Sequence, residues 1–464
     1  MATVHALFWF DVEDCSVTQS DDAAKRLALI LERHGVRGTM KLVGQKARML
    51  EQRVRYDVID ALRRHDVGYH ANWHGLRPQV VEYLAPLDWE EGVAEFERRE
   101  WPGLADVRRL FGTNPVTYGQ PGPNWAPQAF PVLRKWGIPT YVSGFGYVGL
   151  DCQPFYYGGL LCTSHLYGKQ GSGDDRNHLM GLNFELGAPG ELEKHQQAFT
   201  RSREQLASSG GLVSILNHPC TLVMKEWFST ELKSPELIEA GYRHFEQFLE
   251  WLLAQPDTRT TCASELLGLY PDLARNRRLT RDEVGAIAAG RTEGITFHRL
   301  GDMALSAAEA FGVLANALRG YLDDGTMPER VLCVSIYNPM CFPGETASGV
   351  VTWDEFCRAT VAVADYVNWK REVPHRVSLA GLRVPPGDYL AALAGVLVRL
   401  LAGQAPPAEV RLAPAALRFE DHVDEGAARS GWASVMMPPG FTAPRLLELA
   451  KLGAWTLKPA ILRG

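Results

Sequence analysis

The first 270 residues alternate short apolar runs with amphipathic stretches. Runs rich in β-branched and aromatic residues predict strands, and apolar residues at helical spacing predict helices between them. The predicted strands are Leu7–Phe10, Gly38–Gly44, Val67–Tyr69, Val116–Tyr118, Thr140–Ser143, Leu212–Leu216 and Arg259–Cys262, and the predicted helices are Asp21–His34, Tyr56–His65 and Asp88–Phe111, the last interrupted near Pro102. This alternation predicts an α/β unit with a parallel sheet or barrel, because β-α repeats connect parallel strands.

A different pattern follows a charged connector at residues 271–302. An acidic residue recurs four positions after an apolar one, and a proline and a valine follow the acid at 19 and 22 positions. The three copies are Leu305, Glu309, Pro328 and Val331; Val351, Glu355, Pro374 and Val377; and Val384, Asp388, Pro407 and Val410. Each copy predicts one helix followed by a short extended segment. We therefore expect a mainly helical repeat domain at 303–412 and a C-terminal tail at 413–464.

Composition and charge narrow the function classes. Hydrophobic residues make up 46% of the chain and charged residues 22%, which fits a soluble globular protein rather than a disordered or fibrous one. The net charge of −6 argues against a nucleic-acid binder or a sensor of anionic membranes. The apolar run Tyr389–Ala402 carries Arg399 and is too short to span a bilayer, so no membrane span is expected.

The N-terminus and the cysteines bear on location. No basic leader precedes the first apolar run at Ala6, so a cytoplasmic location is the default expectation, with export by another route left open. The 8 cysteines include no C-x-x-C pair, which predicts reduced thiols rather than disulfides or a thiolate zinc site.

Two polar motifs follow predicted strands. Asp11, Glu13 and Asp14 come at the end of the first strand, where barrel folds gather catalytic groups. His70 and His74 follow the third strand, and a helical turn would bring such a pair onto one face. Two neutral imidazoles and one carboxylate leave positions open for water and substrate, as a catalytic metal site requires.

Two further motifs also follow strands. One is Gln120-Pro121-Gly122, whose composition alone predicts a turn. The other is His218, at the end of a late apolar strand, where a lone histidine is more often packed than catalytic. The Gly-rich stretch Gly171–Asp175 predicts a long loop, and no G-K-[ST] follows it to indicate a phosphate cradle.

Together these motifs resemble those of the polysaccharide deacetylase family, the NodB homology domain. The resembling segments are Phe10–Asp14, His70 to His74 after Asp66-Val67-Gly68, Gln120-Pro121-Gly122, Leu216-Asn217-His218-Pro219 and the closing strand Thr261–Leu266. The resemblance covers residues 1–270 and implies a distorted (β/α) barrel of seven to eight units. It also implies hydrolysis of the N-acetyl group of an amino-sugar-containing glycan by a divalent metal, zinc before cobalt, manganese or iron.

The resemblance assigns roles residue by residue. Asp11 would be the general base, His218 the general acid, and His70 and His74 two of the metal ligands. The third ligand would be Glu13 or Asp14, and spacing alone does not choose between them.

Substrate binding would involve Gln120, Pro121 and Gly122, with Trp73 and Trp125 as surfaces that could stack on a sugar. Two positions depart from the family pattern. Gln120 stands where the family usually has arginine, so the charged tether expected to orient the base is missing. Ala71 stands where serine or threonine is usual.

The repeat region resembles pseudomurein-binding repeats, from Glu355-Phe356 through Tyr366-Val367 to Val384–Leu397. This implies a possible cell-wall polymer as partner. A helical packing domain without a ligand fits the same positions, because a helix core needs apolar residues at that spacing anyway.

Two alternatives to glycan deacetylation remain open. The missing arginine favours hydrolysis of a non-sugar amide or cyclic ureide, and it also favours a non-catalytic glycan-binding protein. The presence of Asp11, His70, His74 and His218 together weighs against loss of catalysis.

Overall fold

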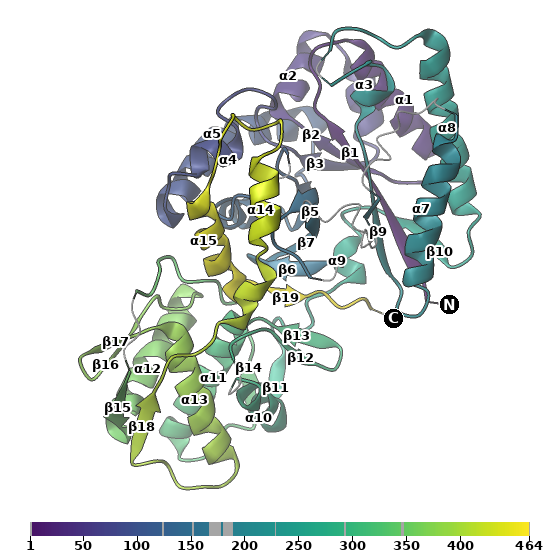
Figure 1. Ribbon diagram of the computed structural model, residues 1–464. Coiled ribbons are helices and arrows are strands. Elements are labelled where there is room, and N and C mark those ends of the chain that lie inside the picture. The colour runs from purple at the N-terminus through teal and green to yellow at the C-terminus, as the bar shows by residue number, and fades with distance from the viewer. Residues whose placement is uncertain are drawn as a thin grey trace.

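A computed structural model describes residues 2–122, 125–150, 153–166, 178–179, 189–227, 229–291, 294–344 and 348–463. Figure 1 shows a larger unit built around a sheet and a smaller, mainly helical unit at its lower left. The predicted loop Gly171–Asp175 lies outside the described residues.

The larger unit contains a sheet of 11 strands. The strands are β1 Val4–Val12, β2 Thr39–Leu42, β3 Asp66–Tyr69, β4 Thr117–Tyr118, β5 Thr140–Gly146, β6 Phe155–Tyr157, β7 Leu160–Leu166, β8 His178–Leu179, β9 Gly211–Asn217, β10 Thr258–Thr261 and β19 Lys458–Pro459. They run in the order β19, β6, β7, β5, β4, β3, β2, β1, β9 and β8, and β10 also pairs with β1. Only the pairs of β6 with β7 and β19 are antiparallel.

The sheet curls into a distorted barrel. The Lys41 ammonium on β2 donates to the carbonyl oxygen of Val142 on β5 at 3.1 Å, although β3 and β4 lie between these strands. In a flat sheet three strand spacings amount to about 14 Å, which a lysine side chain does not span. The contact therefore crosses the barrel interior, and the predicted α/β barrel fold is confirmed.

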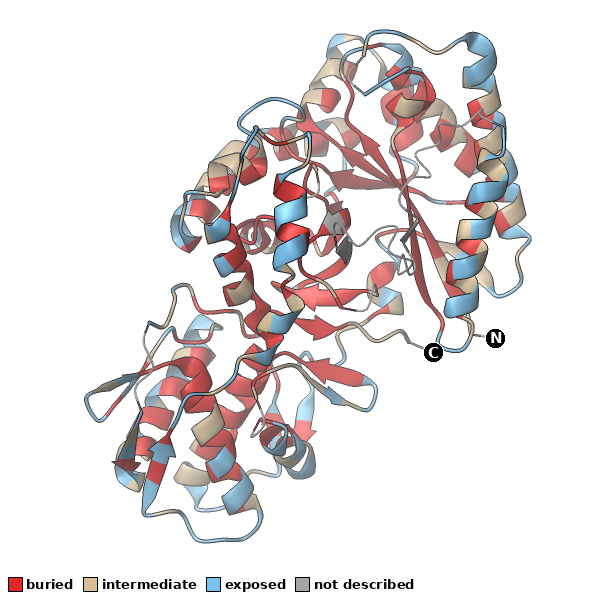
Figure 2. Ribbon diagram, viewed as in Figure 1, coloured by how far each residue is buried: buried red, intermediate tan, exposed pale blue. Residues whose placement is uncertain are grey.

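Helices cover the outside of the curled sheet (Figure 1). They are α1 Gln19–Arg33, α2 Gly44–Gln52, α3 Tyr56–Leu62, α4 Val80–Leu84, α5 Trp89–Phe111, α6 Ala129–Lys135, α7 Glu191–Gln205, α8 Pro235–Leu253, α9 Leu266–Leu269 and the 3-10 turn η1 Pro219–Leu222. Alternate residues of β1 lie on opposite faces of the sheet. On one face, the rings of Phe8 and Phe10 contact Phe245 of α8, with centroids 6.3 and 6.1 Å from it. Trp9 packs on the other face, in a separate apolar cluster. Figure 2 shows this unit buried along its strands and exposed on its outer helices.

One helix differs from its prediction. The interruption predicted near Pro102 is absent, and α5 is continuous through that residue. Pro102 is exposed, whereas Phe96, Leu104 and Val107 are buried on the opposite side. Burial of that apolar stripe holds the helix together despite the backbone hydrogen bond that proline removes.

The smaller unit is built from four helices and short paired strands. The helices are α10 Arg281–Ala289, α11 Ala307–Asp324, α12 Trp353–Lys370 and α13 Pro386–Leu401. The antiparallel pairs are β11 Arg278–Thr280 with β14 Arg330–Leu332, β12 His298–Leu300 with β13 Met303–Leu305, β15 Gly349–Thr352 with β18 Glu409–Leu412, and β16 Val377–Leu379 with β17 Leu382–Val384. Each predicted repeat copy contains a helix and a later short strand, which is β14, β16 or β18.

The recurring acids of this unit have a local structural role. Glu309 and Glu355 are third residues of their helices, and each forms a reciprocal capping box with Ser306 or Thr352. Asp388 accepts instead from the backbone N–H of Ala415, at 2.8 Å. The repeated spacing therefore marks the first turn of a helix in all three copies, with a capping box in two and a bond to a later loop in the third.

The C-terminal residues return to the barrel. They form η2 Arg418–His422, α14 Glu425–Trp432, α15 Pro444–Gly453, η3 Ala454–Thr456 and β19. Within β19, Lys458 pairs in register with Tyr156 of β6, and its ammonium lies 2.8 Å from Glu309 and 2.7 Å from Asp272. This strand links the two units by main-chain and ionic contacts. In the part of the chain that the structure describes, no helix is long and apolar enough to cross a membrane.

Candidate metal centre

The chemically active side chains lie where four neighbouring parallel strands end. In sheet order these strands are β3, β2, β1 and β9. His70 follows β3 directly, His218 follows β9 directly, and Asp11 and Glu13 lie at the end of β1. Parallel strands present their carboxyl ends at one edge, so four distant segments meet there.

Glu13, His70 and His74 form a compact group. One Glu13 carboxylate oxygen, Oε2, lies 3.1 Å from Nε2 of His70 and 3.1 Å from Nε2 of His74. The two imidazole rings are stacked with centroids 5.6 Å apart. Ligand atoms of the three residues lie within 4.8 Å of one another, so one cation could contact all three. Two imidazoles and one carboxylate suit zinc and related divalent metals.

Hydrogen bonding and burial set the orientation and the protonation state of the two imidazoles. The other ring nitrogen of His70, Nδ1, contacts the backbone oxygen of Gly119 at 2.5 Å, which fixes the ring orientation. Burial lowers the pKa of His74 to about 4 and the pKa of His70 well below its ordinary value. Both imidazoles are therefore neutral near pH 7, the form that binds a metal.

The segment between the two histidines is a loop, so the helical turn expected there is wrong. Ala71 has a φ of +89°, which an α-helix does not contain. The Asn72 backbone N–H donates to the buried Glu100 carboxylate at 2.6 Å, and the Tyr69 hydroxyl donates to the same carboxylate at 2.8 Å. These bonds from outside the segment hold it in its own conformation and direct both imidazoles at Glu13.

Asp11 lies beside this group, between a lysine and a histidine. Its Oδ1 is 2.9 Å from the Lys41 ammonium, and its Oδ2 is 3.4 Å from Nε2 of His218. Burial alone would raise the pKa of Asp11, but attraction by His70 and Lys41 outweighs burial and lowers that pKa. Because His70 is neutral near pH 7, the Lys41 charge keeps Asp11 ionised there.

Lys41 is the functional residue that sequence reasoning missed. It lies in register with Asp11 across the β1–β2 pair, and Gly68 of β3 is its neighbour on the other side. A Cβ atom at Gly119 would lie 2.3 Å from the Lys41 nitrogen, so this glycine leaves the space that the ammonium fills. A charged residue inside the apolar strand Thr39–Leu42 was the available signal, because buried lysines need a partner.

Asp14 and the Gln120 turn are placed differently from the metal group. The Asp14 carboxylate accepts from the backbone N–H groups of Ser16 at 3.1 Å and Val17 at 3.4 Å, so it supports its own loop. The Gln120 side chain is buried, and neither its amide oxygen nor its amide nitrogen has a hydrogen-bond partner among the residues that the structure describes. Gly122 has a φ of +73°, as the predicted turn needs.

The tryptophans near the motifs differ in exposure. Trp73 is 48% exposed, and the Arg48 guanidinium lies over its ring. Trp125 is fully buried and contacts Tyr141 with ring centroids 5.0 Å apart, so its ring packs in the core. Trp227, which the motifs did not indicate, is 45% exposed and meets the His218 ring edge-on at 4.6 Å.

Comparisons with known proteins give fold resemblances only. No family model matches the chain, and no curated protein matches it. A Pseudomonas aeruginosa protein assigned as a polysaccharide deacetylase matches at 15% identity and a TM-score of 0.41, over 58% of this chain and 93% of that one. One from Mycobacterium smegmatis matches at 17% identity and a TM-score of 0.38, over 57% and 90%. A 4-alpha-glucanotransferase from Thermococcus litoralis matches at 16% identity and a TM-score of 0.40, over 58% of this chain and 41% of that one.

Proposed function

We propose that this protein is a metal-dependent hydrolase that removes N-acetyl groups from an amino-sugar-containing glycan. One observation supports the proposal: Glu13, His70 and His74 bring ligand atoms within 4.8 Å of one another, and Asp11 and His218 flank them at the same barrel mouth. A cation site with an ionised acid and a histidine beside it provides each group that amide hydrolysis needs.

In this proposal Glu13, His70 and His74 hold a divalent cation, zinc before cobalt, manganese or iron. When bound, the cation stabilises negative charge on the amide oxygen and makes water more acidic. Asp14 is left out of the ligand set because it is not grouped with the two histidines, and its carboxylate accepts from the backbone of its own loop.

The remaining residues move protons. Asp11 accepts a proton from the attacking water, since its carboxylate is ionised and lies beside the cation group. His218 donates a proton to the amine nitrogen as the C–N bond breaks, which yields acetate and a free amino sugar. Lys41 holds the Asp11 carboxylate in place from the side opposite His218.

The rim of the site fits a sugar. Trp73 and Trp227 are half exposed and extend from the segments that carry the site histidines. Exposed aromatic rings offer rigid apolar area to the faces of a pyranose ring. The family resemblance of the motifs points to the same substrate class.

Metal analysis with an acetate-release assay tests this proposal. The wild type should bind one zinc ion per chain and release acetate from N-acetylated sugar oligomers. His70→Ala and Glu13→Gln should lose the metal, whereas Asp11→Asn should keep it and lose turnover. Asp14→Asn is the matched control, expected to keep the metal. A wild type that binds no more metal than His70→Ala would refute the proposal.

A second candidate is hydrolysis of a non-sugar amide or cyclic ureide. It is favoured by Gln120, whose buried amide has no partner and could pair with a neutral amide of the substrate. A panel that compares N-acetylated sugars with cyclic amides separates the two candidates. Metal binding without turnover of either class would favour a glycan-binding protein, and cell-wall binding by the C-terminal unit stays a prediction.

A further inference from the structure

Four lysine or arginine side chains are buried among the described residues: Lys41, Lys46, Arg291 and Lys458. Three of them have a carboxylate close by. Lys41 lies 2.9 Å from Asp11, Lys46 lies 2.5 Å from Asp21, and Lys458 lies 2.8 Å from Glu309. The protein therefore usually neutralises a cation that it buries.

Arg291 is the exception. It follows α10 and Gly290, and it is 1% exposed. None of its guanidinium atoms Nε, Nη1 and Nη2 has a hydrogen-bond partner, and it forms no ion pair with any described residue. Burial lowers its pKa to about 10, so the group is still charged near pH 7.

An unpaired buried guanidinium lowers the stability of the folded protein. Burying a charge is compensated only when an opposite charge and hydrogen bonds replace the lost water. A planar guanidinium presents five N–H donors that match two oxygens of a carboxylate or phosphate. The missing partner of Arg291 is therefore best supplied by an oxyanion.

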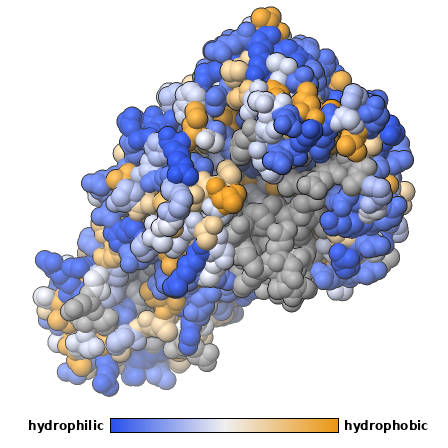
Figure 3. Space-filling view, turned by 45° about the horizontal axis from the view of Figure 1, so that its top comes forward, coloured by the Kyte–Doolittle hydropathy of each residue, from blue (hydrophilic) through white to orange (hydrophobic). Residues whose placement is uncertain are grey.

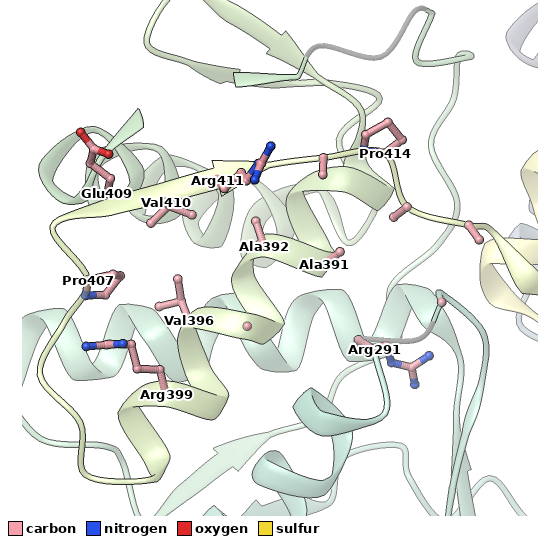
Figure 4. Close-up of a pocket in the computed structure, with 15 residues that line it drawn as sticks. Arg291, Ala391, Ala392, Val396, Arg399, Pro407, Glu409, Val410, Arg411 and Pro414 are labelled. Carbon is pink, nitrogen blue, oxygen red and sulfur yellow. The ribbon is translucent and has the colours of Figure 1, made fainter. Parts of the chain in front are cut away.

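A cavity adjoins this arginine and has room for such a ligand, and because Arg291 is 1% exposed, its guanidinium must turn toward the cavity to contact one. Its volume is about 610 Å³, and its lining comes from Arg291 and Gly294, from α13, and from β18 with the segment that follows it. Figure 4 shows Arg399 on α13 and Arg411 on β18 at separate points of the lining. Glu409 is the one acidic residue in the described lining, so cations outnumber acids there.

We propose that the C-terminal unit binds a small organic anion in this cavity, with its carboxylate or phosphate group on Arg291. A cavity of this volume falls within the range of small-molecule sites, which is roughly 300–1,000 Å³. Arg399 and Arg411 attract the ligand by charge from the rim. The inference does not depend on the proposed hydrolase activity, because its residues lie outside the barrel.

The thermal unfolding midpoint of the 464-residue chain, measured at constant ionic strength, tests the site. Inorganic phosphate and glucuronate are the probes, and glucose, which lacks the glucuronate carboxylate, is the neutral control. The midpoint of the wild type should rise saturably with at least one of the two anions and not with glucose. A response to phosphate alone indicates a phosphate-bearing ligand, and a response to glucuronate indicates a carboxylate.

Substitutions at Arg291 test whether this residue binds the anion. Arg291→Met should lose the response, whereas Arg330→Gln, which removes an exposed arginine of the same unit, should keep it. Arg291→Lys retains the charge but not the planar fork, so its half-saturating concentration should rise at least tenfold. An Arg291→Met response equal to that of the wild type, an unchanged half-saturation in Arg291→Lys, or no wild-type response to either anion would overturn the proposal.

Discussion

The barrel mouth and the C-terminal cavity each contain a buried cation, and their surroundings differ. Lys41 has the Asp11 carboxylate at 2.9 Å and the Val142 carbonyl at 3.1 Å. Arg291 is buried to the same degree but has neither kind of partner among the described residues. The first region already contains its counter-charge, whereas the second obtains one only with a ligand. A buried charged residue therefore points to a ligand only where no group of opposite charge lies beside it.

The largest effect we expect is on turnover at the barrel mouth. Asp11→Asn removes the proposed base and should lower kcat by about 10²- to 10⁴-fold. Zinc content should stay near that of the wild type, because the proposed ligands are Glu13, His70 and His74; a loss of zinc would place the cation in the second group, Asp11, Glu13 and His218. Acetate release and metal analysis on the same preparation check this. Normal turnover in this variant would remove Asp11 from the mechanism.

The next effect concerns the contribution of the Lys41–Asp11 ion pair to stability. Lys41→Met leaves the Asp11 carboxylate buried without its ammonium and should lower the free energy of unfolding by about 3–5 kcal/mol. Urea unfolding measures this change. The double variant with Asp11→Asn should lose less than Lys41→Met alone, because no carboxylate is then left uncompensated. Equal losses would show that the two groups are not coupled.

The opposite change in the free energy of unfolding is expected at Arg291, the buried cation without a partner among the described residues. Arg291→Met removes an unpaired buried charge, so without added anion the free energy of unfolding should rise by about 1–4 kcal/mol. Urea unfolding in a buffer without phosphate or carboxylate measures it, with Arg330→Gln as the surface control. If Arg291→Met and Lys41→Met destabilise alike, the contrast between the two regions fails.

A smaller effect tests the space around Lys41. A Cβ atom at Gly119 would lie 2.2 Å from the Val142 carbonyl oxygen and 2.3 Å from the Lys41 nitrogen. Gly119→Ala should therefore cost about 1–3 kcal/mol and reduce turnover, since the ammonium must move. Gly268→Ala is the matched control, because no atom lies within 4 Å of its Cβ position. Similar stabilities for the two variants would contradict the crowding argument.

The sequence located the candidate site residues better than the partners that support them. The ends of β1, β3 and β9 could be found from apolar runs, so the acidic motif, His70 and His218 were expected at strand ends, where the structure places them. Lys41 was missed because its partnership with Asp11 depends on the register between two strands, which hydrophobic alternation alone does not specify.

Three further features also needed three-dimensional information. Spacing left Glu13 and Asp14 equivalent, whereas in the structure Glu13 lies 3.1 Å from both histidines and Asp14 accepts from the backbone of Ser16 and Val17. The charge on Arg291 looked ordinary in the sequence, because the absence of a partner is a property of the packed chain. The helical turn expected at residues 70–74 was overridden by tertiary hydrogen bonds to Glu100.

The position of β19 at the sheet edge has a consequence for biosynthesis. Tyr156 of β6 pairs with Lys458, so this edge of the barrel stays open while the intervening residues are translated. An open strand edge invites pairing with other chains. A chain that stalls or is cut before Lys458 would leave this edge of β6 uncovered and prone to aggregation. This edge of the sheet is therefore covered only after the C-terminal segment that contains β19 has been made.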